Sequence, residues 1–413
     1  MIAVGEALRI VLAHATPLGA ERVGLSDAAG RVAAATIRSS RTVPAGDNSA
    51  MDGFAVRADD VAAAGARLRL IGTAPAGAAL DAPVEPGTAA KIFTGGLVPD
   101  GADTVVRVED TAEADGVVTV RVAVKPGANV RRAGEDVAPG AIVLAAGTVI
   151  GPADVGVLAS VGRATVAVHR RPRVAICSTG AELVEVDEVP ARAQVVNSNA
   201  WALAGAVREA GGEPVVLPIA RDRLDEIRAR LAEAARADVV LSTGGVSVGE
   251  LDFVKEALDD LGVERLFWKV AQKPGRPLTF GRRDATLFFG LPGNPVSALV
   301  CFAVYVGPVL RRLAGHTRLH LPAVEATLAT SLRKAKALTE FVRVQLRRDD
   351  DGGWVATPAA SQSSGVLSAM SAGAGLLVGP AAVDVLEAGS RHPVLVAGPD
   401  ALRTERPFAP DLH

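Results

Sequence analysis

The stretch DVVLSTGG, residues 238–245, ends a run of apolar residues with a turn of two hydroxyl residues and two glycines. A second stretch of the same design, RVAICSTG, occupies residues 173–180. At the carboxyl end of a strand, a Ser-Thr-Gly turn exposes backbone N–H groups and hydroxyls, which suit a phosphate or another oxyanion. A plain strand-to-helix turn would explain one such stretch, but two in one sheet favour a binding site. The residues expected to contact the anion are Ser178, Thr179, Gly180, Ser242, Gly244 and Gly245.

The chain around these turns alternates between strand and helix patterns over residues 172–318. Residues 198–211 have helical periodicity, with Ser198 as a plausible N-cap and Gly211 at the end, and residues 223–237 place apolar side chains on one face. Such alternation predicts a doubly wound parallel sheet with helices on both faces, and ligands bind such sheets at the carboxyl ends of the strands. Neither turn continues as a P-loop or a Gly-x-Gly-x-x-Gly fingerprint, which weakens a kinase or dehydrogenase interpretation.

The rest of the 413-residue chain has a different texture, and the whole indicates a multidomain protein of the α/β plus β class. Short apolar runs separated by turns indicate a β-rich domain over residues 47–122, with a hairpin across the Gly-containing link near residue 116. This domain is inserted into an extended linker domain formed by residues 1–46 and 123–171. Residues 319–413 lose the helical periodicity and indicate a C-terminal β-barrel-like domain.

Composition argues against several classes of protein. A net charge of −2 and only 3% aromatic residues disfavour a nucleic-acid binder, which would show a basic face and stacking rings. The two cysteines, Cys177 and Cys301, imply neither a disulfide framework nor a zinc site. The most apolar run, residues 296–310, is shorter than the ~20 residues that span a bilayer, and Glu6 and Arg9 interrupt the first apolar stretch. We therefore expect a cytoplasmic protein with no membrane or nucleic-acid partner.

Acidic residues follow both Ser-Thr-Gly turns. Glu182 comes after the first turn, and the second continues as GGVSVGELDF, which adds Ser247, Glu250 and Asp252. Solvated carboxylates are common, but next to a phosphate-type turn their charge would repel an anion unless a cation lay between them. Mg²⁺ held by one or two carboxylates and by substrate phosphates fits this arrangement. The predicted Mg²⁺ ligands are Glu182 and Asp252.

A cationic turn lies in the stretch VAQKPGRPLTFG, residues 270–281. Lys273 and Arg276 flank a Pro-Gly turn, and no acidic partner lies nearby in the sequence. Two like charges on a rigid turn are unfavourable unless an anion sits between them, and both residue types suit oxyanions. From the residues alone, a solvated turn and an anion site are equally good interpretations. Asn294 or Ser297, near the start of the next apolar helix, is a further candidate for anion binding.

Seven motifs extend these observations over nearly the whole chain. In sequence order they are NSAMDGFAV, KIFTGG, RRAGED, STGAEL, STGGVSVGELDF, KPGRPLTFG and GLPGNPVSA. With these motifs in this order, the chain resembles the molybdopterin molybdenumtransferases, the family of bacterial MoeA and of the E domain of gephyrin. The resemblance implies a MogA-like α/β domain, a lid formed by the β-rich domain, and homodimers whose active cleft lies between the α/β domain of one subunit and the lid of the other. It also implies a Mg²⁺-dependent reaction that inserts molybdate into adenylylated molybdopterin and releases AMP.

Matching the motifs residue by residue implies further roles. On the lid, the implied catalytic residues are Asp52, Thr94 and Asp136, which would face the cleft of the partner subunit. On the α/β domain they are Glu182, Asp222, Asp252, Lys269 and Lys273. The implied molybdate pocket consists of Ser247, Arg276 and Pro277, completed by Arg343 and Ser364 from the C-terminal domain. No catalytic cysteine or histidine is implied.

Three other functions stay open. An adenylyltransferase that makes adenylylated molybdopterin shares the α/β fold, but that class of enzyme lacks the lid and the C-terminal domain. A non-catalytic molybdopterin-binding scaffold would need an added interaction segment, and the sequence has no long linker or extra domain. A paralogue that handles tungstate would carry the same motifs, so the sequence does not separate it from a molybdate enzyme.

Overall fold

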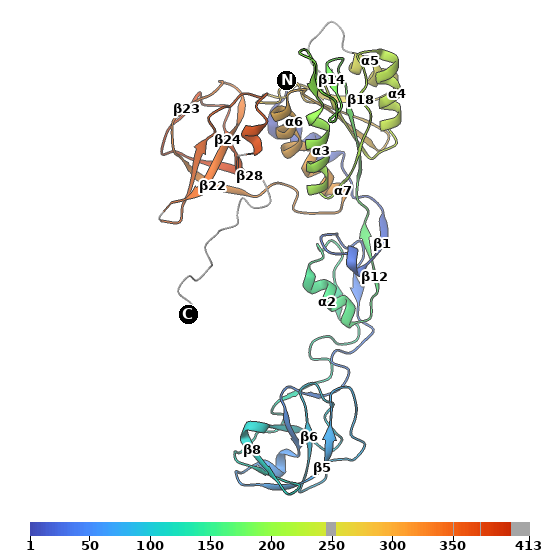
Figure 1. Ribbon diagram of the computed structural model, residues 1–413, viewed down its shortest axis with the longest axis vertical. Coiled ribbons are helices and arrows are strands. Elements are labelled where there is room, and N and C mark those ends of the chain that lie inside the picture. The colour runs from blue at the N-terminus through green and yellow to red at the C-terminus, as the bar shows by residue number, and fades with distance from the viewer. Residues whose placement is uncertain (245–252, 350, 372, 398–413) are drawn as a thin grey trace. The chain divides into compact units, whose positions relative to one another are not determined.

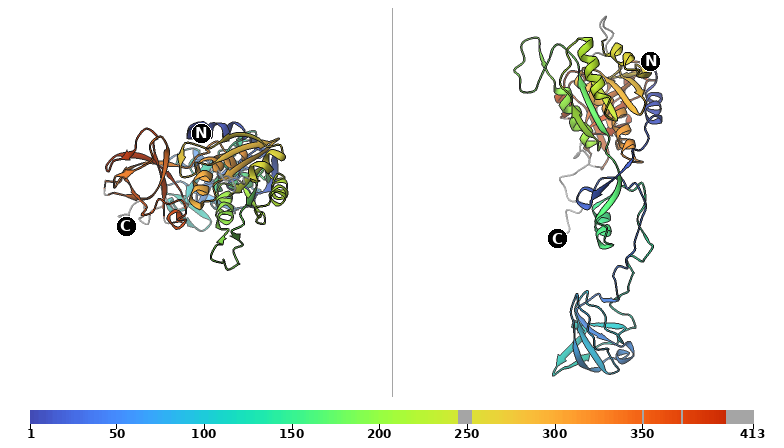
Figure 2. Two further views of the ribbon diagram at one scale, coloured as in Figure 1. Left: turned by 90° about the horizontal axis from the view of Figure 1, so that it is seen from above. Right: turned by 90° about the vertical axis from the view of Figure 1, so that its right-hand side faces the viewer.

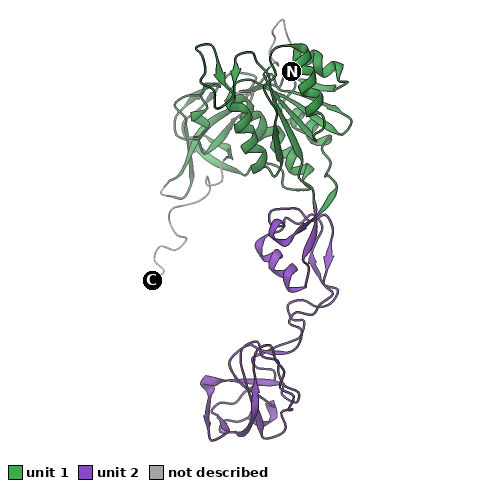
Figure 3. Cartoon of the chain, turned by 45° about the vertical axis from the view of Figure 1, so that its right-hand side comes forward, with its two compact units in different colours: residues 1–21, 169–413 green, residues 22–168 purple. Residues whose placement is uncertain are grey.

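The computed structural model describes residues 1–244, 253–349, 351–371 and 373–397. The chain forms two compact units, one of residues Met1–Glu21 with His169–His413 and the other of residues Arg22–Val168 (Figure 3). Strands β1 (Ala20–Gly24) and β12 (Thr165–His169) lie at the two points where the chain passes from one unit to the other. Each unit has hydrophobic cores of its own. The finer division into four domains stays a prediction.

The first unit contains the expected α/β sheet. Its six strands lie in the order β16 (Glu213–Val216), β13 (Arg173–Ser178), β17 (Val239–Thr243), β21 (Thr286–Leu291), β20 (Thr279–Arg283) and β18 (Glu264–Trp268). The first four run parallel to one another, as expected. Strand β20 is antiparallel to both of its neighbours, so the expectation of an entirely parallel sheet is wrong at this strand. The cause is a tight connection from β20 to β21 through Asp284, which has a φ of 53°.

Helices cover both faces of this sheet, as Figure 2 shows for the green to orange part of the ribbon. One face packs against α1 (Val4–Ala13), α3 (Ser198–Glu209), α6 (Pro295–Cys301) and α7 (Gly307–Leu313), and the other against α4 (Leu224–Ala234) and α5 (Phe253–Asp260). Alternate residues of β13 belong to the two cores, with Ile176 in one and Cys177 in the other. The middle of β13, residues 174–177, is therefore apolar because both of its faces are buried.

Two helix details differ from the sequence pattern. The N-cap of α3 is Asn197 and not Ser198, because the Asn197 side chain accepts a hydrogen bond from the Ala200 N–H. A π-helical turn, Phe302–Val306, joins α6 to α7. The combined segment Pro295–Leu313 is long and apolar enough to cross a membrane, but 78% of its most apolar window is buried inside the protein, as in a core helix.

The C-terminal part of the first unit is a closed five-stranded barrel, which confirms the expected barrel-like fold (Figure 1). Its strands are β24 (Thr339–Arg348), β25 (Trp354–Pro358), β22 (Ala323–Leu328), β28 (Arg391–Val396) and β26 (Gly375–Gly379), and β26 pairs with β24 to close it. Short elements β23 (Leu332–Arg333), β27 (Val385–Leu386) and α8 (Ser368–Ser371) complete this part. Strand β19 (Gln272–Lys273), from the cationic turn, pairs with β24 and so joins the α/β part to the barrel.

The second unit contains the β-rich sheet predicted from the sequence. Its strands lie in the order β7 (Thr104–Arg107), β4 (Gly53–Val56), β6 (Thr88–Ile92), β5 (Arg67–Ala74), β9 (Val117–Val120) and β8 (Thr111–Ala114). The β8–β9 hairpin turns through Asp115 and Gly116, both with positive φ, which confirms the predicted hairpin. The same unit contains α2 (Pro152–Ser160), and it pairs β2 (Ile37–Arg38) with β11 (Ile142–Leu144) and β3 (Asn48–Ser49) with β10 (Val130–Arg131).

Candidate functional site

The two Ser-Thr-Gly turns lie side by side at the carboxyl ends of β13 and β17. The parallel register places Ser178 opposite Thr243, and the Thr179 N–H donates to the Thr243 carbonyl at 2.9 Å. The Thr243 hydroxyl donates to Ser178 Oγ at 3.1 Å, and Ser178 Oγ in turn donates to Asn197 Oδ1 at 3.0 Å. These buried hydroxyls therefore hold the two turns and the start of α3 together.

Gly244 permits this close approach. Its φ is +90°, and a Cβ built on it would lie 2.4 Å from the Thr179 carbonyl oxygen. Any other residue would combine backbone strain with a steric clash against backbone. The glycine predicted to contact an anion thus also allows the two turns to pack against each other.

The first of two cavities, here called the turn cavity, has a volume of about 510 Å³ and opens at these turns. The turn residues that line it are Thr179, Thr243 and Gly244. The other lining residues include Leu183 of strand β14 (Leu183–Val184), both residues of strand β15 (Val195–Val196), Glu182, Asn199, Pro277 and residues 292–295. Ser178, Gly180 and Ser242 do not line it, and Gly245 lies outside the described residues. Sequence analysis missed Thr243, although it stands in the same motif as Ser242.

Two side chains organise the wall of the turn cavity. Asp222 does not line it, but its carboxylate accepts the Ala181 N–H at 2.9 Å and so fixes the loop that carries Glu182. Asn199 Nδ2 donates to the Gly293 carbonyl at 2.7 Å, while its buried Oδ1 has no hydrogen-bond partner within the described residues. The cavity therefore presents acceptor oxygens from Glu182 and Asn199 next to the hydroxyls of the turns.

The second cavity, here called the cationic cavity, has a volume of about 410 Å³ and lies where the cationic turn meets the barrel. It is lined by all six residues from 272 to 277, together with Ser297, Glu340, Phe341, Arg343, Gln362, Ser363 and Ser364. Pro277 lines both cavities. The structure thus brings together Lys273, Arg276, Pro277, Arg343 and Ser364, which the sequence placed in one pocket, whereas Ser247 lies outside the described residues.

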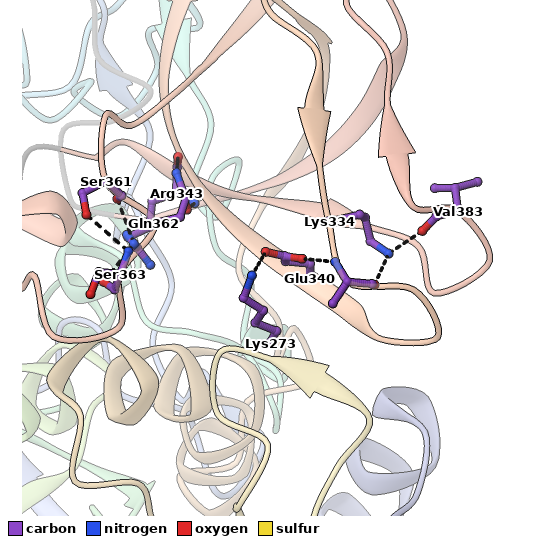
Figure 4. Close-up of polar contacts among 9 residues, drawn as sticks. Lys273, Lys334, Glu340, Arg343, Ser361, Gln362, Ser363 and Val383 are labelled. Atoms are coloured by element: carbon purple, nitrogen blue, oxygen red, sulfur yellow. Dashed lines mark hydrogen bonds and ion pairs between the residues drawn. The ribbon is translucent and has the colours of Figure 1, made fainter.

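Arg343 is the largest fully buried side chain, with 1% of its surface exposed (Figure 4). Its Nη2 donates to the carbonyl oxygens of Ser361 and Ser363 at 2.8 and 3.1 Å. Its Nε and Nη1 have no hydrogen-bond partner among the described residues. Burial lowers the pKa of Arg343, yet a guanidinium remains charged at neutral pH. Buried charged donors without partners are unfavourable, so this side chain suits an anionic ligand.

Lys273 has an acidic partner that the sequence did not reveal. The parallel pairing of β19 with β24 places Lys273 opposite Glu340, and Lys273 Nζ lies 2.9 Å from Glu340 Oε1. No acidic partner of Lys273 is local in the sequence, as stated from the residues, and the partner that the structure shows comes from a distant strand. Arg276 forms no ion pair with any described residue and keeps its charge free for a ligand.

A buried network fixes the cationic turn from behind. Gln272 Nε2 donates to the Pro274 carbonyl at 2.9 Å, and the hydroxyl of Tyr305, in the π-helical turn, donates to Gln272 Oε1. The thiol of Cys301 donates to the Gly275 carbonyl at 3.6 Å, and burial raises the pKa of Cys301, which keeps the thiol protonated. A Cβ at Gly275, whose φ is +92°, would lie 2.5 Å from that sulfur.

Ser364 and Lys269 occupy different surroundings. Ser364 Oγ accepts a hydrogen bond from Asn294 Nδ2 at 2.9 Å, and its carbonyl accepts the Val296 N–H, so it is tied to the start of α6. The ammonium of Lys269 lies over the Trp268 ring, 4.4 Å from its centroid. Lys269 lines neither cavity, and its catalytic role stays a prediction.

In the second unit, Asp52 and Thr94 are in direct contact. The Thr94 N–H and hydroxyl both donate to Asp52 Oδ1, at 2.7 and 2.8 Å, and the bond from the N–H lowers the pKa of this exposed carboxyl. The residue after Asp52 has to be a glycine, because a Cβ at Gly53 would lie 1.9 Å from the Val106 carbonyl oxygen of the neighbouring strand. No hydrogen bond joins Asp136 to this pair in the described residues; its N–H donates to the Val43 carbonyl at 3.2 Å.

The structure is that of a multidomain α/β protein in which a cavity lined by cationic side chains adjoins a cavity at two Ser-Thr-Gly turns. Comparison with protein families gives three matches, which together span most of the chain. They are the MoeA N-terminal region (domain I and II) over residues 2–162, a probable molybdopterin binding domain over residues 175–312, and the MoeA C-terminal region (domain IV) over residues 325–396.

Individual proteins agree with this assignment. A molybdopterin molybdenumtransferase of Nostoc is 41% identical over 303 residues, covering 71% of this chain and 70% of the relative. One of Bacillus subtilis is 34% identical and covers 96% of this chain and 94% of the relative. The crystal structure of a molybdopterin biosynthesis MoeA protein from Pyrococcus horikoshii matches 96% of this chain and all of its own, with a TM-score of 0.81 and 29% identity. This chain belongs to the MoeA family of molybdopterin molybdenumtransferases.

Proposed function

We propose that this chain is a cytoplasmic, homodimeric transferase of molybdenum cofactor biosynthesis, which inserts molybdate into adenylylated molybdopterin and releases AMP. Membership of the family supports the transferase and the cofactor pathway. The observation that carries the proposal is the adjacency of the two cavities, which share Pro277. One has a phosphate-type turn and the other is cationic, so a phosphate-bearing pterin and a tetrahedral oxyanion can be held next to each other.

The proposed mechanism is electrostatic and uses no covalent enzyme intermediate. In the turn cavity, the turn residues at 179 and 243–244 hold the phosphoanhydride of the adenylylated pterin. In the cationic cavity, Arg276 and Arg343 donate charge-assisted hydrogen bonds to molybdate, and Lys273 supplies a point charge. These groups concentrate molybdate beside the dithiolene sulfurs that accept the metal. Attack of a water or molybdate oxygen on the anhydride forms a new P–O bond as the bridging P–O bond breaks, which yields AMP and the pterin phosphate.

The residues present fit Mg²⁺ in a limited way. Glu182 lines the turn cavity and offers the hard oxygen ligand that Mg²⁺ prefers. Asp252, the second proposed ligand, lies outside the described residues, and within the described residues no three His, Cys, Asp or Glu side chains cluster to hold a metal. This agrees with an ion held by one or two carboxylates and by substrate phosphates. When bound, Mg²⁺ would lower the negative charge of the phosphoanhydride.

Asp52, Thr94 and Asp136 are proposed to act in the site of the partner subunit. Apolar side chains support a contact surface here, since four large ones are exposed in the loops that carry or adjoin the Asp52–Thr94 pair: Met51, Phe93, Leu97 and Val108. Exposed apolar groups around a polar pair are typical of an interaction surface. At a molybdate concentration too low for Arg343→Met to release AMP, mixing it with inactive Asp52→Ala subunits should restore activity, because each mixed dimer keeps one intact site. If verified subunit exchange restores nothing, the site is built within one chain.

The direct test is AMP release by the purified protein with adenylylated molybdopterin, Mg²⁺ and molybdate. We expect release that depends on molybdate and on Mg²⁺, and that is absent in Arg276→Ala. A parallel series with tungstate tests the alternative of a tungstate-handling paralogue. A protein that binds molybdopterin but releases no AMP under any of these conditions would instead match the non-catalytic scaffold.

A further inference from the structure

The cationic cavity contains one acidic residue that anion binding does not explain. Glu340 is 5% exposed and lines the cavity together with three cationic residues, Lys273, Arg276 and Arg343. A carboxylate in the wall of a cavity that receives an oxyanion opposes that binding by like-charge repulsion. Burying a carboxylate is also unfavourable unless it is paired and hydrogen-bonded. A residue that opposes binding at its own site therefore needs another role.

Both oxygens of Glu340 are held. Oε1 lies 2.9 Å from Lys273 Nζ, and Oε2 accepts the Ala335 N–H at 3.0 Å. The segment that provides this N–H is itself anchored, because Lys334 Nζ donates to the carbonyl oxygens of Ala335 and Val383 at 3.0 and 2.6 Å (Figure 4). The carboxylate is thus fixed in place before any ligand arrives.

The other end of the contact is mobile by nature. The Lys273 side chain is 52% exposed, whereas that of Glu340 is 6% exposed. A lysine carries four rotatable bonds and three N–H donors, so the ion pair with Glu340 restrains the ammonium, which keeps N–H donors for a ligand. Lys273 and Glu340 are also partners in the backbone pairing of β19 with β24. The rigid partner is therefore the carboxylate, and the partner that it orients is the ammonium.

We propose that Glu340 is a positioning residue, which holds the Lys273 ammonium at the wall of the cationic cavity in the orientation needed for molybdate transfer. This inference rests on the proposed function. Glu340 raises the rate of molybdate transfer by orienting Lys273, while its negative charge lowers the affinity of the cavity for molybdate. Without Glu340, Lys273 would sample many orientations. The net charge of the described residues that line the cavity would also rise from +2 to +3, because only Lys273, Arg276 and Arg343 would remain charged.

The test compares Glu340→Gln with the wild type. Glutamine keeps the volume and still accepts the Ala335 N–H, but it does not pair with the ammonium. We expect the rate of AMP release at saturating molybdate to fall about tenfold or more, because the substitution removes the ion pair that orients the ammonium. Molybdate affinity, measured by calorimetric titration with molybdate alone, should be unchanged or tighter. A merely structural role would weaken affinity, rate and melting temperature together, and that result would overturn the proposal.

A double-mutant cycle shows whether Glu340 acts through Lys273. In a Lys273→Met background, Glu340→Gln should cause no further loss of rate, whereas independent roles would multiply the two losses. Glu340→Asp should retain part of the rate, and Glu325→Gln, an exposed acid of the same barrel, should behave as wild type. Multiplied losses, or a wild-type rate in Glu340→Gln, would contradict the proposal.

A readout without turnover separates this proposal from the proposed function. If the wild type released no AMP, the proposed reaction would fail, but crystals grown with molybdate would still show where Lys273 lies. We expect its ammonium between Glu340 and the anion in the wild type, and in several orientations in Glu340→Gln. An ammonium turned away from both Glu340 and the anion in the wild type would overturn the positioning role.

Discussion

Replacing Arg343 with methionine should separate binding from stability. The side chain is 1% exposed, and its Nε and Nη1 have no partner among the described residues, so a bound oxyanion would supply the missing acceptors. Charge-assisted hydrogen bonds contribute about 1.5–3 kcal/mol, which corresponds to a loss of about 10- to 150-fold in molybdate affinity. Methionine is shorter but unbranched, flexible and uncharged, so it fills much of the same space.

The stability of the fold should change little. The substitution removes two hydrogen bonds, to the carbonyls of Ser361 and Ser363, each contributing about 1 kcal/mol. It also removes a buried charge, whose desolvation costs several kcal/mol and offsets that loss. The melting temperature should therefore stay within about 3 °C of the wild type, a shift that corresponds to about 1 kcal/mol for a chain part of this size.

The assay is AMP release against molybdate concentration at fixed adenylylated pterin, with a thermal melt of each protein. Arg347→Met is the matched control, because Arg347 is an exposed residue of the same strand and does not line the cavity. An unchanged molybdate dependence in Arg343→Met would refute the assignment of Arg343 to the anion site. A fall in melting temperature as large as the fall in affinity would show that Arg343 serves the fold instead.

Three further substitutions test other parts of the account. Asp52→Asn keeps an acceptor for both Thr94 donors, so we expect a wild-type melting curve and AMP release reduced about 100-fold or more, as when an oriented charge is lost from a site; wild-type release would remove Asp52 from the site. Gly244→Ala forces a side chain against the Thr179 carbonyl at positive φ, so a strain of about 1–3 kcal/mol should lower the melting temperature and weaken pterin binding, and an unaffected variant would contradict the packing described for the turns. Burial alone would raise the pKa of Asp238. Hydrogen bonds from the Arg170 side chain and from the Arg173 N–H outweigh this effect and leave the pKa lowered. The stabilisation by Asp238 is therefore present at neutral pH, and Asp238→Asn should lower the melting temperature at pH 7 by an amount that shrinks as the pH falls below about 4; a difference independent of pH would rule out the ion pair as its cause.

Local patterns predicted the elements of the fold because their causes lie within a few residues. Hydrophobic periodicity marked α3 and α4, and the Asp-Gly link marked the β8–β9 hairpin. The antiparallel β20 was missed, since a short hairpin embedded in an α/β pattern looks like one more connection. The N-cap of α3 was placed one residue too late, at Ser198 and not at Asn197, because asparagine and serine both cap helices well and the sequence does not choose between them.

Contacts of the candidate site could be predicted where they follow from a local motif, and could not be predicted where they depend on the pairing of strands that are distant in the sequence. The Ser-Thr-Gly turns lie adjacent as expected, because parallel neighbours end at the same sheet edge. Glu340 could not be found in this way, since only the pairing of β19 with β24 places it beside Lys273. The turn-fixing contact of Tyr305 with Gln272 likewise depends on tertiary packing.

The central claim is that the cavity formed by the cationic turn and the barrel holds molybdate. Diffraction at the molybdenum absorption edge, from crystals of the protein grown with molybdate, tests it most directly. The account predicts one strong anomalous peak per subunit in the cationic cavity, at a molybdenum atom whose surrounding oxygens lie within hydrogen-bonding distance of Arg276 and Arg343. A peak confined to other positions, or no peak at concentrations that saturate AMP release, would contradict it.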